Sequence, residues 1–146
     1  MQYLLLYGGT PAATLARWRD AGEAVTAYRH LTDAMIGKRW VFDPDPLTLP
    51  AGCEGQVFRI DPKAPHGGDV VVTLVNLSRS WQDKQLTEGL SLTVRLPEAG
   101  ELQKATWAAP SLKPAEPVGC EIRREGDSLT VSLPPVGAAG VLRLSR

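Results

Sequence analysis

The spacing of the hydrophobic residues changes once along this chain, at the seam formed by residues 36–40 (IGKRW). Before the seam, apolar residues recur at intervals of three and four, which is typical of a helix with one buried face. After the seam they recur at every second position, which is typical of β-strands. The pattern therefore predicts a helical segment that leads directly into an all-β domain.

Local signals indicate where the helical segment begins and where it is interrupted. Thr10 is a favourable N-cap residue, and Pro11 suits the first helical position, where its missing N–H costs nothing. Asp20 with Glu23 repeats a capping pattern inside the segment. We therefore expect either one helix that bends near Gly22 or two helices separated at Asp20.

The apolar residues of the helical segment are expected to form one stripe along its surface. They are Leu15, Trp18, Val25, Tyr28, Leu31 or Thr32, and Met35. Gly37 is suited to end the helix in a left-handed conformation. Residues 1–7 before Gly8 and Gly9 predict a short strand, so the segment has the order of a βα unit. A βα unit normally belongs to a larger α/β structure.

The second part of the chain contains about seven or eight short apolar segments separated by turn signals. They cover residues 40–42, 56–60, 70–77, 90–96, 102–107, 120–124, 128–133 and 140–144. Residues 70–77 are almost solid in β-branched and apolar side chains, which predicts a central strand buried on both faces. Residues 125–127 (EGD) predict a hairpin turn.

These patterns predict a mainly β protein: an antiparallel β-sandwich of about seven to eight strands, preceded by an N-terminal helical segment. Residues 1–38 form the strand and helical segment in this interpretation, and residues 39–146 form the sandwich. The chain has 146 residues and 43% hydrophobic content, enough for one substantial core.

Charge and hydropathy disfavour two classes of partner. Lys and Arg together number 16, as do Asp and Glu, and the basic residues are scattered, so nucleic acid is not an expected partner. The longest apolar run, residues 3–7, is too short to span a bilayer. No basic segment precedes it, so we predict neither a signal peptide nor a membrane partner. The sequence does not indicate a cellular compartment.

The motif search predicts no catalytic residue, no metal ligand and no cofactor. There is no GxSxG, phosphate-binding loop or CxxC, and neither His30 nor His66 has a second ligand at a metal-binding spacing. Both histidines are expected at the surface or in packing. Gly8-Gly9-Thr10 is compatible with an anion site but is better explained as a plain turn. Cys53 and Cys120 either pair across two strands or, as we favour, stay buried free thiols.

Four aspartates near predicted strand ends leave two interpretations open. They are Asp43, Asp45, Asp61 and Asp69. Their oxygens could gather around a calcium ion, but solvated turn residues are the favoured interpretation.

The four tryptophans have different expected roles. Trp18 is a packing residue of the helical stripe, Trp40 is placed to wedge the helix against the sheet, and Trp107 lies on a weak strand. Trp81 lies in the polar stretch of residues 78–84, where an aromatic side chain is expected to be exposed. It is the candidate ligand-binding residue, because an exposed ring stacks on the C–H face of a sugar. The alternative is that Trp81 folds back over the sandwich edge.

Seven stretches of the chain carry a resemblance to a known family: residues 37–42, 46–50, 57–60, 69–76, 105–110, 133–136 and 141–144. Together they resemble the C-terminal part of certain TIM-barrel glycoside hydrolases. In that family the last barrel helix leads through a seam of this kind into an antiparallel β-sandwich. The family's acid and nucleophile lie on upstream barrel strands, so no catalytic residue is carried over to this chain.

Three functional hypotheses follow. The first is a non-catalytic C-terminal accessory sandwich of a carbohydrate-active enzyme, which supports or shapes the catalytic barrel and has no activity of its own. The second is an autonomous carbohydrate-binding module that holds a glycan at Trp81. The third is a protein-interaction or assembly module that pairs through the helix or an exposed strand edge. The expected partners are thus a barrel domain, a second copy of the chain through the helical face, or a glycan.

Overall fold

The computed structural model describes residues 11–80, 84–113 and 115–146, which form one α-helix, one 3₁₀ helix and nine β-strands. The predicted strand at residues 1–7, the turn at Gly8-Gly9-Thr10 and the capping role of Thr10 lie outside the described residues. The elements are α1 (Pro11–Asp33), β1 (Lys38–Trp40), β2 (Leu47–Thr48), β3 (Cys53–Ile60), β4 (Val70–Asn76), β5 (Ser91–Arg95), η2 (Pro97–Glu101), β6 (Lys104–Ala108), β7 (Val118–Glu125), β8 (Ser128–Ser132) and β9 (Ala139–Ser145).

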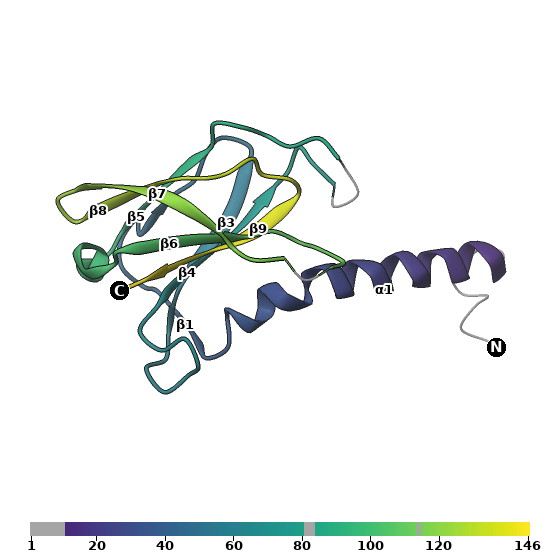
Figure 1. Ribbon diagram of the computed structural model, residues 1–146, viewed down its shortest axis with the longest axis horizontal. Coiled ribbons are helices and arrows are strands. Elements are labelled where there is room, and N and C mark those ends of the chain that lie inside the picture. The colour runs from purple at the N-terminus through teal and green to yellow at the C-terminus, as the bar shows by residue number, and fades with distance from the viewer. Residues whose placement is uncertain (1–10, 81–83, 114) are drawn as a thin grey trace.

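The nine strands form one antiparallel sheet that curls over on itself, with the order β1-β3-β4-β9-β6-β7-β8-β5-β2. Strand β7 makes the connection between the two layers (Figure 1). Its residues 118–120 pair with β6, whereas its residues 121–125 pair with β8. The predicted class, a mainly β antiparallel sandwich after a helical segment, is confirmed. The additional strand is β2, whose two residues are too few to show a period.

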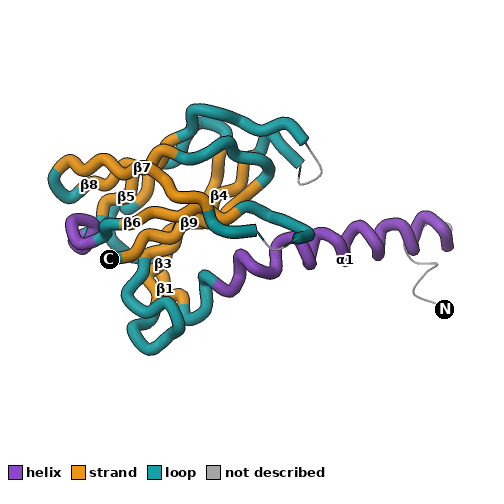
Figure 2. Tube along the Cα trace, viewed as in Figure 1, coloured by secondary structure: helices purple, strands orange, loops and turns teal. Residues whose placement is uncertain are grey.

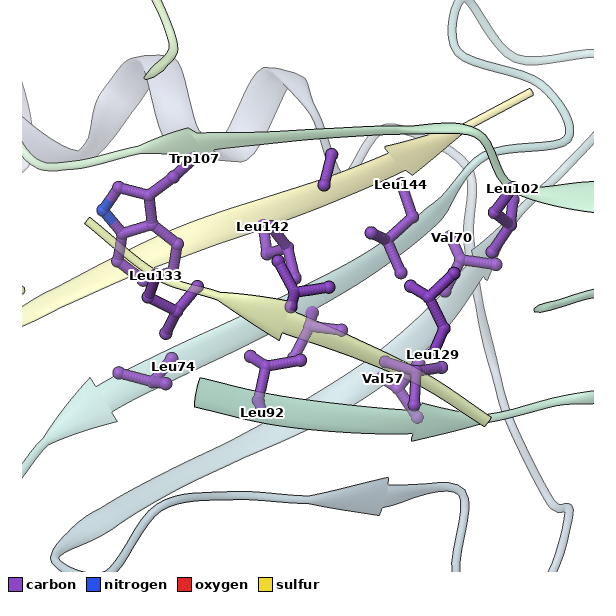
Figure 3. Packing of buried hydrophobic residues seen from close by; sticks show 14 of the residues in the cluster. Val57, Val70, Leu74, Leu92, Leu102, Trp107, Leu129, Leu133, Leu142 and Leu144 are labelled. Atoms are coloured by element: carbon purple, nitrogen blue, oxygen red, sulfur yellow. The ribbon is translucent and has the colours of Figure 1, made fainter. Parts of the chain in front are cut away.

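The main core lies between the two layers (Figure 3). Leu92 of β5 and Leu129 of β8 point inward from one layer, and Leu142 of β9 points inward from the other; each is at most 1% exposed. Burying one such side chain contributes about 1.5–3 kcal/mol. Trp107 lies at one end of this core and Leu102 at the other (Figure 3).

The predicted hairpin and the central position of the predicted strand are confirmed, but its burial on both faces holds only for the first residues, because Val75 and Leu77 are 47% and 62% exposed. Strand β4 lies between β3 and β9, and its residues 70–72 are at most 1% exposed because both faces of the strand are covered. Strands β7 and β8 are joined by Gly126 and Asp127, with Glu125 paired to Ser128. Gly126 has φ +60°, a left-handed conformation that glycine adopts without steric cost.

Helix α1 runs uninterrupted through Asp20 and Gly22, so the two-helix alternative is wrong. The helix ends at Asp33, and three further residues form turns before Gly37. Gly37 has the left-handed conformation that we predicted, with φ +77°. The spacing of the apolar residues changes from the helical to the strand period immediately afterwards, because β1 begins at Lys38 and pairs with β3.

The apolar residues of α1 do not form one stripe, which corrects the sequence-based expectation. Leu31 is 4% exposed and packs on the outer face of the sheet, with Tyr28 and Met35 half-buried beside it. Leu15, Trp18 and Val25 are exposed. At 3.6 residues per turn, Val25 and Trp18 lie about 120–140° around the helix axis from Leu31. Only one face of α1 is therefore covered by the sandwich.

Candidate functional site

The N-terminal part of α1 carries the most unusual exposed surface of the described chain. It extends beyond the strands, away from the sandwich (Figure 1). Leu15 and Trp18 on this part are 68% and 73% exposed, and Val25, just past the middle of the helix, is 70% exposed. Contiguous apolar residues of this size are rarely left in water, and such surfaces mark interaction sites. We refer to these three residues as the helix face.

The C-terminal part of α1 is fixed to the sandwich by a second, smaller core. Leu31 packs there with Ile60, Val71 and Val141, which come from β3, β4 and β9. This contact sets the direction in which the helix face projects.

Two hydrogen bonds connect α1 to the β6–β7 connection, defined as residues 109–113 and 115–117, which passes beside the helix (Figure 2). His30 Nε2 lies 2.7 Å from the carbonyl oxygen of Ala109, and a carbonyl only accepts, so Nε2 carries the hydrogen. The backbone N–H of Ser111 donates to the carbonyl of Ala27 at 2.9 Å. His30 therefore has a structural role in this contact.

Three hollows lie beside the β6–β7 connection. One of 430 Å³ lies between the connection and α1, and its border includes Arg29, Asp33, Lys113 and Glu116. One of 310 Å³ lies between the connection and the sandwich, with three prolines and Trp107 on its border. A smaller hollow of 210 Å³ contains both His30 and His66.

Trp40 does not wedge the helix against the sheet as we predicted. Its ring packs on Phe58 of β3, with the ring centroids 5.0 Å apart and the planes tilted by 57°. The ammonium group of Lys38 lies 5.1 Å from the centroid of the same Phe58 ring. Trp40 at the seam is 61% exposed and Phe42, just after the seam, is 90% exposed, so two further apolar side chains are exposed here.

An arginine with two carboxylate partners holds the chain after the seam against β3. Arg59 Nε and one of its terminal nitrogens lie 2.5 and 3.1 Å from the two oxygens of Glu98, and its other terminal nitrogen lies 2.7 Å from Asp43. The hydrogen bonds from Arg59 lower the pKa of both carboxyl groups, and those carboxylates raise the pKa of Arg59. This cluster connects three segments that are distant in sequence.

Three of the four aspartates considered as calcium ligands pair with arginines instead. Asp43 binds Arg59, Asp61 binds Arg39, and Asp69 lies 3.1 Å from Arg143. Burial raises the pKa of Asp69, and this effect outweighs the opposing effect of Arg143. Within the residues that the structure describes, no three His, Cys, Asp or Glu side chains are grouped as a metal site requires.

The structure tests the predictions for the two cysteines and for one of the two remaining tryptophans. Cys53 and Cys120 are free and half-buried, so the disulfide alternative is wrong, and burial raises the pKa of both thiols. Trp81, the candidate glycan platform, lies outside the described residues. Trp107 is buried, at 2% exposure, and its Nε1 has no hydrogen-bond partner among the described residues.

The helix face and the hollows could not be found from sequence. The apolar residues of α1 were visible, but their spacing does not show which of them the sheet covers. In the described part of the chain, no helix has the length and apolar character needed to cross a membrane.

No family model and no curated protein sequence matches this chain. Among solved structures, the chain is similar to a cycloisomaltooligosaccharide glucanotransferase of Paenibacillus sp., determined in complex with cycloisomaltoheptaose. The TM-score is 0.51 and the sequence identity is 17%, over 82% of this chain and 19% of that enzyme. The likeness is one of fold, and this chain spans about a fifth of the length of that enzyme.

Proposed function

We propose that this chain is a non-catalytic β-sandwich accessory domain of a carbohydrate-active enzyme, and that α1 packs it against a catalytic barrel. Two independent findings support the proposal. The fold is similar to a part of a glucanotransferase. The sequence around the seam also resembles the junction between barrel and sandwich in TIM-barrel glycoside hydrolases.

The observation that carries the proposal is the helix face. Trp18 is 73% exposed in the N-terminal part of α1, and the sandwich covers this helix only toward its C-terminal end. The last helix of a barrel packs on its neighbours along such a face, and Leu15 and Val25 extend the same surface. The sandwich covers the opposite face through Leu31. One helix would thus belong to both domains and would set their relative orientation.

The first experiment determines the coding sequence immediately upstream of residue 1. An adjoining barrel-encoding sequence in the same reading frame supports the proposal, whereas an unrelated neighbour or a stop codon contradicts the covalent arrangement.

The second experiment measures association of the 146-residue chain with that upstream barrel, produced separately. Trp18→Asp is expected to weaken binding by at least about tenfold, because it places a charge in an apolar contact. The matched control is Leu77→Asp, which changes an apolar side chain of similar exposure, 62%, after β4. Equal binding by Trp18→Asp and the wild type would contradict the role of the helix face.

A second candidate function, a homo-oligomeric assembly module, is favoured by the same helix face. In this case the partner is another copy of α1. Light scattering on the purified chain distinguishes the two functions: a dimer that Trp18→Asp converts to a monomer supports assembly, and a monomer at high concentration counts against it.

The autonomous carbohydrate-binding module with Trp81 as its platform stays a prediction. Replacement of Trp81 by Ala should abolish retention in a glycan-containing affinity gel. Unchanged migration of this variant relative to wild type would contradict the role of Trp81 as a glycan platform.

A further inference from the structure

The two larger hollows beside the β6–β7 connection adjoin one another. His30, Ser111, Ala115 and Glu116 border both of them. Their volumes, 430 and 310 Å³, fall within the range of small-molecule sites, about 300–1,000 Å³. We refer to these two adjoining hollows together as the depression.

The larger hollow has balanced and unpaired charges. Arg29 and Asp33 of α1 border it on one side, and Lys113 and Glu116 of the β6–β7 connection border it on the other. Six ion pairs are formed elsewhere among the described residues, but none involves any of these four. Two cations and two carboxylates leave no net charge to select an ion. They match a neutral ligand whose hydroxyl groups donate to carboxylates and accept from cations.

The smaller hollow offers the complementary apolar surface. Pro110, Pro134 and Pro135 border it and present C–H groups. Trp107 lies on the same border. A sugar ring combines apolar C–H faces, which pack on apolar side chains, with hydroxyl groups, which meet the charges of the larger hollow.

The position of the larger hollow relates it to the helix face. Arg29 follows Trp18 by eleven residues, about three turns of an α-helix, and Asp33 follows Leu15 by eighteen, about five turns. These polar residues therefore continue the exposed side of α1 toward its C-terminal end. A glycan bound there would lie next to the surface that is proposed to meet the barrel.

We propose that the depression between α1, the β6–β7 connection and the sandwich binds a neutral oligosaccharide segment. Hydroxyl groups of one ring meet the charged residues of the larger hollow, and the next ring packs on the prolines of the smaller one. The choice of a carbohydrate rests on the proposed function, whereas the location rests on the geometry of this chain.

The test is a titration of the 146-residue chain with isomaltooligosaccharides and maltooligosaccharides. Calorimetry measures the affinity, and changes in backbone NMR chemical shifts locate the bound glycan. We expect saturable binding, with shifts concentrated in residues 26–33 and 109–117. The double variant Asp33→Asn, Glu116→Gln should bind at least about tenfold more weakly, because it removes two charged acceptors. The matched control is Glu121→Gln, Asp127→Asn, which removes two exposed carboxylates at the far hairpin and should bind like wild type.

Each contrary result has a distinct meaning. No binding of either glycan at millimolar concentration, equal affinity in the Asp33→Asn, Glu116→Gln variant, or shifts confined to another surface overturns this site. If the chain still associates with the upstream barrel through Trp18, such a result leaves the proposed function intact. Failure to associate with any barrel, with glycan binding retained, would instead overturn the proposed function.

Discussion

The indole of Trp107 occupies the space in which a side chain at position 140 would lie. A Cβ atom built on Gly140 would be 2.1 Å from Cζ2 of Trp107 and 2.5 Å from its Cε2. Both residues are on adjacent strands, since β6 pairs with β9. Glycine at position 140 therefore allows the largest side chain of the core to lie flat against the β9 backbone.

Gly140→Ala should destabilise the protein by about 1–3 kcal/mol, because neither a buried indole nor a central strand can move freely. Urea unfolding followed by circular dichroism measures this change. Gly119→Ala on β7 is the control, since a Cβ there meets nothing within 4 Å. Equal stability of Gly140→Ala and the wild type would mean that the Trp107 ring does not lie against β9.

Two leucines of α1 should respond very differently to truncation. Leu31→Ala removes a 4% exposed side chain from the second core and should cost about 2–4 kcal/mol. Leu15→Ala changes a 68% exposed side chain and should alter the stability by less than about 0.5 kcal/mol. Denaturant unfolding of the two variants tests which face of α1 is covered. Similar losses in both would contradict the division of the helix into two faces.

The cluster around Arg59 should make stability depend on acidity. Hydrogen bonds from Arg59 lower the pKa of Glu98 below its usual value of 4.5 in the folded state. A carboxyl group with a lowered folded-state pKa stabilises the protein at neutral pH, and this contribution is lost as pH falls from about 4.5 through the lower folded value. Glu98→Gln should therefore lower the melting temperature at pH 7, with a difference that shrinks on acidification.

Thermal unfolding between pH 3 and 7 is the measurement for the Glu98→Gln prediction. Asp69 acts in the opposite direction, because burial raises its pKa, so the difference between wild type and variant is the informative quantity. Glu101→Gln in the same 3₁₀ helix is the control, since its ion pair with Arg146 is exposed and contributes little. A constant difference between wild type and Glu98→Gln at every pH would contradict the prediction.

Cys53 and Cys120 should both be detected as free thiols under non-reducing conditions. After unfolding, a disulfide-exchange reagent should detect two thiols per chain. In the folded protein both should react more slowly than a free thiol at pH 8, because burial raises the pKa of each and leaves less thiolate. Detection of no thiol after unfolding would indicate a disulfide instead.

Most of the strands were predictable because the information that specifies them is local. Residues 70–77 were nearly solid in apolar side chains, residues 90–96 alternated, and Gly126 marked a hairpin, so each segment carried its own signal. Strand β2 carried none, because two residues are too few to display a period. It is defined by its partner, since Leu47 pairs with Val94.

The candidate site was much less accessible from sequence. The positions of Arg29 and Glu116 show no motif, and they border one hollow only because the β6–β7 connection passes beside α1. The carboxylate partners of Arg59 are likewise 16 and 39 residues away from it. Such contacts arise from chain packing, and no periodicity encodes them.

The sequence by itself determined the change from helix to strand at residues 36–40, the antiparallel strand content and the left-handed glycine at position 37. These properties follow from side-chain period and backbone sterics over a few residues. Only the tertiary structure decided which face of α1 is buried, how β7 joins the two layers, and why Gly140 must lie beside Trp107. Those properties depend on which distant segments compete for the same apolar surface, and that competition is resolved only when the sheet closes.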